Sequence, residues 1–459
     1  MIKNNLTEGN ISKVLLKLAL PIMGTSFVQM AYNLTDMFWV GKLGSLAVAA
    51  VGTGGFFMWL SMAFIFISKI GAEVGVAQSV GRDDVTGIRS TVKSALQINV
   101  ILALVYGGIL MLFKRPLIQF FDIKEVEVVD QAVAYLAIVG GGMIFSFSNQ
   151  VFTAILNGYG NSRTPFVINV IGLLINMVLD PLLILGGGPF PALGVKGAAI
   201  ATVIAQMIGT CIFVYNMRKD PVLFSGLDFF KFTESKRIKQ IIRLGTPVAL
   251  QSGLFTIFAM FIARVIAGYG ATPVAVQRIG SQIESISWMT AGGFSTAISA
   301  FVGQNYGAGK WDRIKRGYFT ALYLVGGIGI FATCLLYFGG GTIFSAFLEE
   351  EEAVRLGIDY LKILAYSQIF MCIEITTAGA FNGLGKTVPP SIVGIILNFL
   401  RIPTAMFLTT VDSLGLNGVW WSISSTSILK GIILTSWFII VLGVNLQPKE
   451  EKLIVKTQN

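Results

Sequence analysis

The residue with the clearest potential for chemistry is Asp36, a carboxylate inside the apolar stretch of residues 17–44. This stretch is long enough to cross the roughly 30 Å apolar layer of a bilayer as a helix. An aspartate at the centre of such a helix costs about 2.5–3.5 kcal/mol, so it is a functional candidate by default. Asp36 also lies near Lys42, where a carboxylate could simply reach toward the membrane surface or cap the helix. This segment alone leaves both interpretations open.

A second acid, Asp180, lies in the apolar sequence INMVLDPLLILG. Asn176 precedes it by one helical turn and therefore shares its face. Pro181 follows directly and leaves a carbonyl one turn earlier without its helical partner. A carboxylate, an amide oxygen and a loosened carbonyl suit a hard monovalent cation, and the carboxylate alone could carry a proton. The alternative is a cluster that only kinks the helix.

The composition indicates which elements must position these acids. The chain has 459 residues, of which 54% are hydrophobic and 13% charged, and its mean hydropathy is +0.74. These values are typical of polytopic membrane proteins. The net charge of +10 comes from short basic clusters between apolar spans, which argues against a nucleic-acid partner.

Residue types also restrict the cofactors. The chain has no histidine, and its three cysteines lie in apolar spans without metal-ligand spacing. We therefore expect no cofactor, no disulfide framework and no metal other than Na⁺ at the candidate site. Any proton relay must use carboxylates.

Twelve apolar segments predict twelve membrane-spanning helices. An even number of spans places both termini on one side, and the basic residues concentrate on the side of the termini, most of all in residues 218–243. By the positive-inside rule this side is cytoplasmic. The polar N-terminus precedes a span too long for a signal peptide. The sequence predicts a multi-pass protein of a prokaryotic plasma membrane.

The chain contains an internal repeat. Pro21 matches Pro247 and Gly44 matches Gly270, both 226 positions apart, and further pairs follow with small drifts: Asn157 with Asn382, Gly160 with Gly385, Asn176 with Asn398, and Gly194 with Gly415. Each half holds six spans, so the two halves have the same orientation, as in transporters built from parallel repeats. We expect an all-α fold with an N-terminal lobe (1–217), a cytoplasmic linker (218–243) and a C-terminal lobe (244–459).

The repeat also shows where the halves differ. Asp36 corresponds to Ile262, and Asp180 corresponds to Ile402. Both deep acids belong to the first half only. Apolar counterparts suggest a specialised site in one lobe.

Together these residues resemble the multidrug and toxic compound extrusion (MATE) family. The resemblance rests on Leu20-Pro21 with Asp36 fifteen residues after the proline, on Asn-x-x-x-Asp-Pro at residues 176–181, and on the Asn-Gly-x-Gly sequences that begin at Asn157 and Asn382. It covers essentially the whole chain. More narrowly, the chain looks like the DinF-type prokaryotic branch, whose ion site lies in the N-terminal lobe.

The resemblance implies roles for individual positions. Asp36, Asn176, Asp180 and Thr202 match the cation or proton site, and Pro21 matches the proline at which the first span bends. The branch with its ion site in the other lobe is known for an acid in span 7, and residues 244–263 contain none.

A substrate cavity is a further expectation. Aromatic faces attract cations and methionines adapt to varied shapes, so the cluster near Asp36 suits planar, apolar cations. The candidates are Met30, Tyr32, Met37, Glu284 and Glu374.

We therefore expect a monomeric secondary antiporter rather than an enzyme, exporting small drugs or metabolites in exchange for H⁺ or Na⁺. No G-x-x-x-x-G-K-[ST] loop is present, so ATP is not the energy source. One alternative, a membrane-embedded transferase, would need paired aspartates in loops, and no D-x-x-x-D-type pair lies in a loop. The other, a lipid-linked saccharide flippase, would need cations in its cavity, for which Arg264, Arg278 and Arg401 are candidates.

Overall fold

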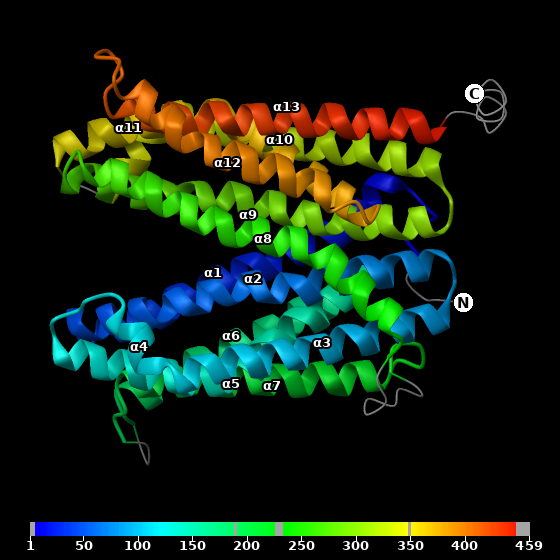
Figure 1. Cartoon of the computed structure of the whole chain (residues 1–459), viewed down its shortest axis with the longest axis horizontal. Coiled ribbons are helices and arrows are strands. Elements are labelled where there is room, and N and C mark those ends of the chain that lie inside the picture. Colours follow the sequence, from blue (N-terminus) through cyan, green and yellow to red (C-terminus); the bar gives the residue numbers. More distant parts are fainter. Residues whose placement is uncertain (1–4, 188–190, 225–232, 348–349, 447–459) are drawn as a thin grey trace. The chain divides into compact units, whose positions relative to one another are not determined.

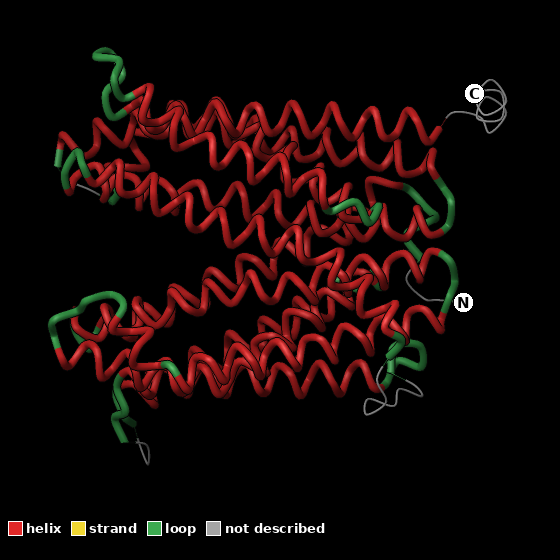
Figure 2. Tube along the Cα trace, in the orientation of Figure 1, coloured by secondary structure: helices red, strands yellow, loops and turns green. Residues whose placement is uncertain are grey.

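The computed structural model describes residues 5–187, 191–224, 233–347 and 350–446, and most of them are helical (Figure 2). The described helices are α1 (Ile11–Gly41), α2 (Ser45–Gly81), α3 (Val85–Leu112), α4 (Lys114–Gln119), α5 (Val126–Gly158), α6 (Arg163–Ile184), α7 (Val195–Arg218), α8 (Ser235–Ala267), α9 (Ala271–Gly307), α10 (Trp311–Ser345), α11 (Glu351–Gly383), α12 (Val388–Leu408) and α13 (Asn417–Leu446). Figure 1 labels these helices and colours them from blue at the N-terminus to red at the C-terminus. The predicted all-α class is confirmed.

Eleven of these helices are long and apolar enough to cross a membrane. The remaining long helix, α9, has the same 37 residues as its repeat counterpart α2. Its first half carries Gln277, Arg278, Gln282 and Glu284, which explains its lower hydropathy. Twelve long helices thus match the twelve expected spans. The short α4, which we did not expect, has only six residues.

The chain forms two compact units. The first contains Leu20–Ala249, and the second contains Leu6–Ala19 together with the chain from Leu250 onward. The opening turns of α1 therefore belong to the second unit, and the opening turns of α8 to the first. The boundaries expected from the repeat lay instead at residues 217 and 244. The segment expected as a linker also loses its last third to α8, which begins at Ser235.

Matched glycines adopt matched backbone conformations in the two units. Gly44 and Gly270 have φ of 101° and 111°, and Gly194 and Gly415 have φ of 57° and 47°. These values lie in the region that only glycine occupies readily. The repeated glycines therefore mark repeated turns between helices.

Close helix contacts build the core of the first unit. A Cβ placed on Gly54 of α2 would lie 2.6 Å from Cδ1 of Tyr135 on α5, so only glycine allows this approach. Tyr106 of α3 donates its hydroxyl to the carbonyl of Phe57 at 2.6 Å. These contacts join α2, α3 and α5, and α7 packs against α5.

The segment before α1 binds the turn between α9 and α10 within the second unit. The Leu6 amide donates to Oε1 of Gln304 at 2.9 Å, and Lys310 Nζ donates to the Thr7 carbonyl at 3.0 Å. Arg313 Nη2 donates to the Glu8 carbonyl at 2.6 Å. The sequence offered no sign of this attachment, because backbone groups accept most of these bonds.

Candidate cation site

The second acid sits on α6 with its predicted partner. Asn176 Nδ2 donates to Oδ1 of Asp180 at 2.9 Å, and both side chains are fully buried. Pro181 lies inside α6, which continues to Ile184. The proline is therefore accommodated within the helix, and the one-turn spacing of the two polar residues produces the expected contact.

Glycines bring two further helices against α6. A Cβ on Gly24 of α1 would lie 2.6 Å from Cε2 of Phe166, so α1 passes close to α6. Gly197 of α7 lies against the backbone carbonyl of Leu183. The Leu193 amide also donates to that carbonyl at 2.9 Å, which ties the start of α7 to the end of α6.

These three helices bring the predicted site residues into one place within the first unit. Asp36 and Asp180 interact electrostatically with each other, and the Tyr32 hydroxyl lies within range of both acids and of Thr202. Tyr32 and Asp36 are four residues apart and so share a face of α1. The site thus combines two carboxyl groups, one amide and two hydroxyls.

Five buried oxygen atoms of this group form no hydrogen bond of standard geometry among the described residues: Tyr32 Oη, Asp36 Oδ1, Asn176 Oδ1, Asp180 Oδ2 and Thr202 Oγ1. Tyr32 nevertheless lies within hydrogen-bonding reach of Thr202, and Asp36 within reach of Asp180. Buried polar atoms are nearly always paired, and each unpaired one costs about 1–3 kcal/mol. A cluster of five oxygens is a set of ligands that a hard cation would satisfy. A proton on one carboxyl group would instead let Asp36 and Asp180 share a hydrogen bond, and a hydrogen bond between Tyr32 and Thr202 would pair two further oxygens.

Tyr135 of α5 is a neighbour that sequence reasoning missed. It is 5% exposed and lies within electrostatic range of Asp36 and Asp180. Tyrosines are common in membrane spans, so nothing in the sequence distinguished this one. Its contact with Gly54 holds the ring in place beside the acids.

The tentative cavity residues fall into separate groups. Met30 and Met37 are two turns apart on one face of α1, and Met37 is 45% exposed, whereas the Tyr32 hydroxyl turns to the acids. Glu284 and Glu374 belong to the second unit. The structure brings Tyr32 to the candidate cation site and leaves the two methionines on a neighbouring face of the same helix.

Glu284 is held in a hydrogen-bond network of the second unit. Its Oε2 accepts from the Tyr360 hydroxyl at 2.9 Å, and its Oε1 accepts from Nε2 of Gln368 at 2.9 Å. Trp420 extends the network by donating Nε1 to Gln277 Oε1 at 3.0 Å. Both carboxylate oxygens of Glu284 are therefore engaged.

The remaining buried charges of the second unit are also engaged. Lys430 Nζ lies 3.2 Å from Oε2 of Glu374, and the two side chains are 9% and 11% exposed. Arg401 donates to the hydroxyls of Thr426 and Ser427 at 3.0 and 2.9 Å. In this unit an ammonium group of the chain itself neutralises Glu374, whereas Asp36 and Asp180 form no salt bridge with a basic side chain among the described residues.

Comparison with known proteins decides the family. The MatE family matches residues 21–182 and 247–407, which include most of both repeats and the positions of Asp36, Asn176 and Asp180. This chain belongs to the MATE family. It is a multi-pass membrane transporter.

Relatives cover nearly the whole length of this MATE chain. A Thermotoga maritima protein named "Probable multidrug resistance protein NorM" is 30% identical over 441 residues, covering 94% of this chain and 92% of that protein. A Shewanella oneidensis protein named "FAD transporter" is 25% identical and covers 94% and 95%. The fold matches a solved MOP superfamily transporter from Pyrococcus furiosus with a TM-score of 0.86 at 24% identity, over 96% and 98% of the two chains.

The pair Glu374–Lys430 gives a stability test of this MATE protein. Replacing Lys430 by Gln leaves Glu374 buried without its partner, which costs about 3–5 kcal/mol. We expect a clear drop in the thermal midpoint of the detergent-solubilised protein. The double variant Lys430→Met with Glu374→Gln should recover most of the loss, because neither member of the pair is then left charged without its partner. A single variant as stable as the native protein would show that the pair contributes nothing.

Proposed function

We propose that this protein is a secondary antiporter that exports small organic compounds, cationic or amphipathic in character, in exchange for H⁺ or Na⁺. The observation that carries the proposal is the cluster of five unpartnered oxygens around Asp36 and Asp180 in membrane-spanning helices. Intramembrane acids of this kind mark ion pathways. The proposal also agrees with the multidrug resistance names of several relatives.

The oxygen cluster supports coupling through a cation. Two nearby carboxylates in a site poor in water repel each other when both are charged, and a bound H⁺ or Na⁺ relieves the repulsion. The hydroxyls of Tyr32 and Thr202 and the Asn176 amide oxygen add neutral ligands. This set favours Na⁺ binding, while either carboxylate alone could carry a proton.

The contacts of the second unit favour an antiporter over a lipid-linked saccharide flippase. A flippase would need cationic groups available to a pyrophosphate. Lys430 is paired with Glu374, and Arg401 is held by two hydroxyls. Arg264 and Arg278 are exposed, and they remain the candidates for such a role.

The test of the proposal is transport by the purified protein in sealed vesicles. A fluorescent organic cation such as ethidium should move against its gradient when a Na⁺ or pH gradient of the opposite direction is imposed. An ionophore that collapses the driving gradient should stop the movement. Ethidium flux equal to that of protein-free vesicles under both gradients would contradict the proposal for this class of substrate.

We further propose that both termini and residues 218–243 face the cytoplasm, on the basis of the basic residues at that side. The exposed Cys211 and Cys334 must first be replaced. In that background, Ser235→Cys should react with an impermeant thiol reagent only after cells are permeabilised. Lys124→Cys, on the opposite side, should react in intact cells. The reverse pattern would overturn the orientation.

A further inference from the structure

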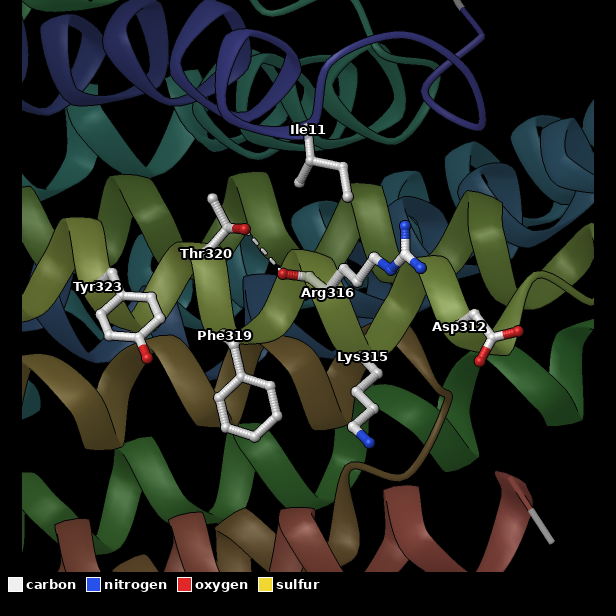
Figure 3. A pocket seen from close by; sticks show the side chains of 7 residues that line it. All are labelled: Ile11, Asp312, Lys315, Arg316, Phe319, Thr320 and Tyr323. Carbon is white, nitrogen blue, oxygen red and sulfur yellow. Dashed lines mark hydrogen bonds between the residues drawn. The ribbon is translucent and has the colours of Figure 1, made fainter.

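A groove in the second unit is lined by Ile11 at the start of α1 and by six residues of α10, namely Asp312, Lys315, Arg316, Phe319, Thr320 and Tyr323 (Figure 3). Its volume is about 560 Å³. We call it the α10 groove. None of its residues belongs to the candidate cation site, which lies in the first unit.

Two basic side chains border the α10 groove. Lys315 and Arg316 are both exposed, and no carboxylate or hydrogen-bond acceptor is recorded for their side-chain nitrogens within the described chain. In Figure 3 Arg316 lies on the side of Ile11 and Lys315 extends away from it. Asp312 is also exposed at one end, so the lining carries one net positive charge.

Neighbouring basic residues have a different task. Lys310 and Arg313 donate to carbonyls of residues 7 and 8 and thereby hold the segment that carries Ile11. One wall of the groove is therefore fixed by the protein itself. The free positive charge of Lys315 and Arg316 remains for a ligand.

The groove changes character along α10. Phe319 and Tyr323 follow the basic pair toward the middle of the span, and Tyr323 is 81% exposed. At 1.5 Å per residue, Tyr323 lies about 10 Å beyond Arg316 along the helix. Basic groups at the membrane surface followed by aromatic groups just below it match the two parts of a phospholipid, the headgroup and the start of the acyl chains.

The repeat supplies an internal comparison. Arg89 of α3 is the counterpart of Lys315, and it donates to the carbonyls of Pro221 and Val222 at 2.8 and 3.1 Å. Gln97, two turns further on, accepts hydrogen bonds from the same connection. In the first unit the chain itself covers this face. In the described part of the second unit, only the start of α1 borders it.

We propose that the α10 groove binds an anionic phospholipid of the cytoplasmic leaflet, with the phosphate at Lys315 and Arg316 and the acyl chains along Phe319 and Tyr323. The aromatic lower part selects a lipid over free phosphate. The leaflet follows from the proposed cytoplasmic side of the α9–α10 turn. The proposal stands apart from the transport activity, because its site and ligand differ.

The test compares lipids on the full-length protein. Mixed micelles containing phosphatidylglycerol should raise the thermal midpoint more than micelles containing phosphatidylcholine, and native mass spectrometry should show retained phosphatidylglycerol. The variant Lys315→Gln with Arg316→Gln should bind phosphatidylglycerol roughly thirtyfold more weakly, because each basic residue contributes separately to anionic-lipid binding. Tyr323→Ala should weaken the binding of both phosphatidylglycerol and phosphatidylcholine, because it removes a contact with the acyl chains.

The matched control is Lys236→Gln with Lys239→Gln, which removes two exposed basic residues from α8 in the first unit. It should keep the native preference for phosphatidylglycerol. An equal response of the native protein to both lipids, or an unchanged preference in the α10 variant, would overturn the proposal. An equal rise of the thermal midpoint with millimolar inorganic phosphate and no phosphatidylglycerol would identify a free anion as the ligand. If only a variant that lacks residues 447–459 preferred phosphatidylglycerol over phosphatidylcholine, that tail would be identified as the occupant of the α10 groove.

Discussion

Asp36→Asn and Asp180→Asn should each reduce gradient-driven export to the level of protein-free vesicles. Each substitution removes a charge with little change in volume, and each acid contributes an oxygen without a partner to the candidate site. Asn176 Nδ2 can still donate to an amide oxygen at position 180, so the local hydrogen bond survives. The measurement is ethidium transport under an imposed Na⁺ or pH gradient.

The matched control is Asp130→Asn in the same unit. Asp130 pairs with Arg115 at 3.6 Å at the surface, and the two side chains are 59% and 61% exposed. Exposed pairs contribute about 0–1 kcal/mol, so transport should be unchanged. All three variants should insert and purify like the native protein. Native transport by Asp36→Asn or Asp180→Asn would reduce that residue to a structural role.

Lowering the pH, or adding Na⁺ at fixed pH, should weaken the binding of an organic cation to the detergent-solubilised protein. If the ion-loaded arrangement of α1, α6 and α7 disfavours substrate, ion and substrate exclude one another, and exchange follows from their different affinities for two states. The measurement is a titration of a fluorescent cation at several pH values and Na⁺ concentrations. Asp36→Asn should bind the cation with little dependence on either ion.

Thr202→Val should distinguish the effect of Na⁺ from the effect of protons in this experiment. The substitution removes a neutral ligand oxygen but leaves both carboxyl groups. Competition by Na⁺ should weaken while competition by protons persists. Substrate affinity that is unaffected by both ions in the native protein would exclude this mechanism without touching the family assignment.

The architecture was predictable because its causes are local. Apolar length sets each span, and the glycines at turns recur in both halves, so the spans and the repeat could be predicted. The pair Asn176 and Asp180 could also be predicted, since a spacing of four residues on a helix places two side chains together. Because Asp36 and Asp180 have the apolar counterparts Ile262 and Ile402 in the second half, the sequence predicted a specialised site in the first lobe alone.

Other features depend on packing between distant segments. Tyr135 approaches the acids because Gly54 lets α5 lie close to α2, and no spacing rule connects these positions. The pairing of Glu374 with Lys430 joins α11 to α13. The sequence singled out Glu374 only as a candidate residue of the substrate cavity, and its partnership with Lys430 needed the structure. The exchange of the opening turns of α1 and α8 between units was likewise unpredictable from the repeat.

The attachment of the N-terminal segment has a consequence for biogenesis. Leu6 and its partner Gln304 are 298 positions apart in the chain. At a synthesis rate of about 5–20 residues per second, Gln304 is made roughly 15–60 s after Leu6. During this interval the side chains of Gln304, Lys310 and Arg313, which bind residues 6–8, have not all been made. The segment of residues 6–8 therefore cannot take its final place before α10 has begun to form.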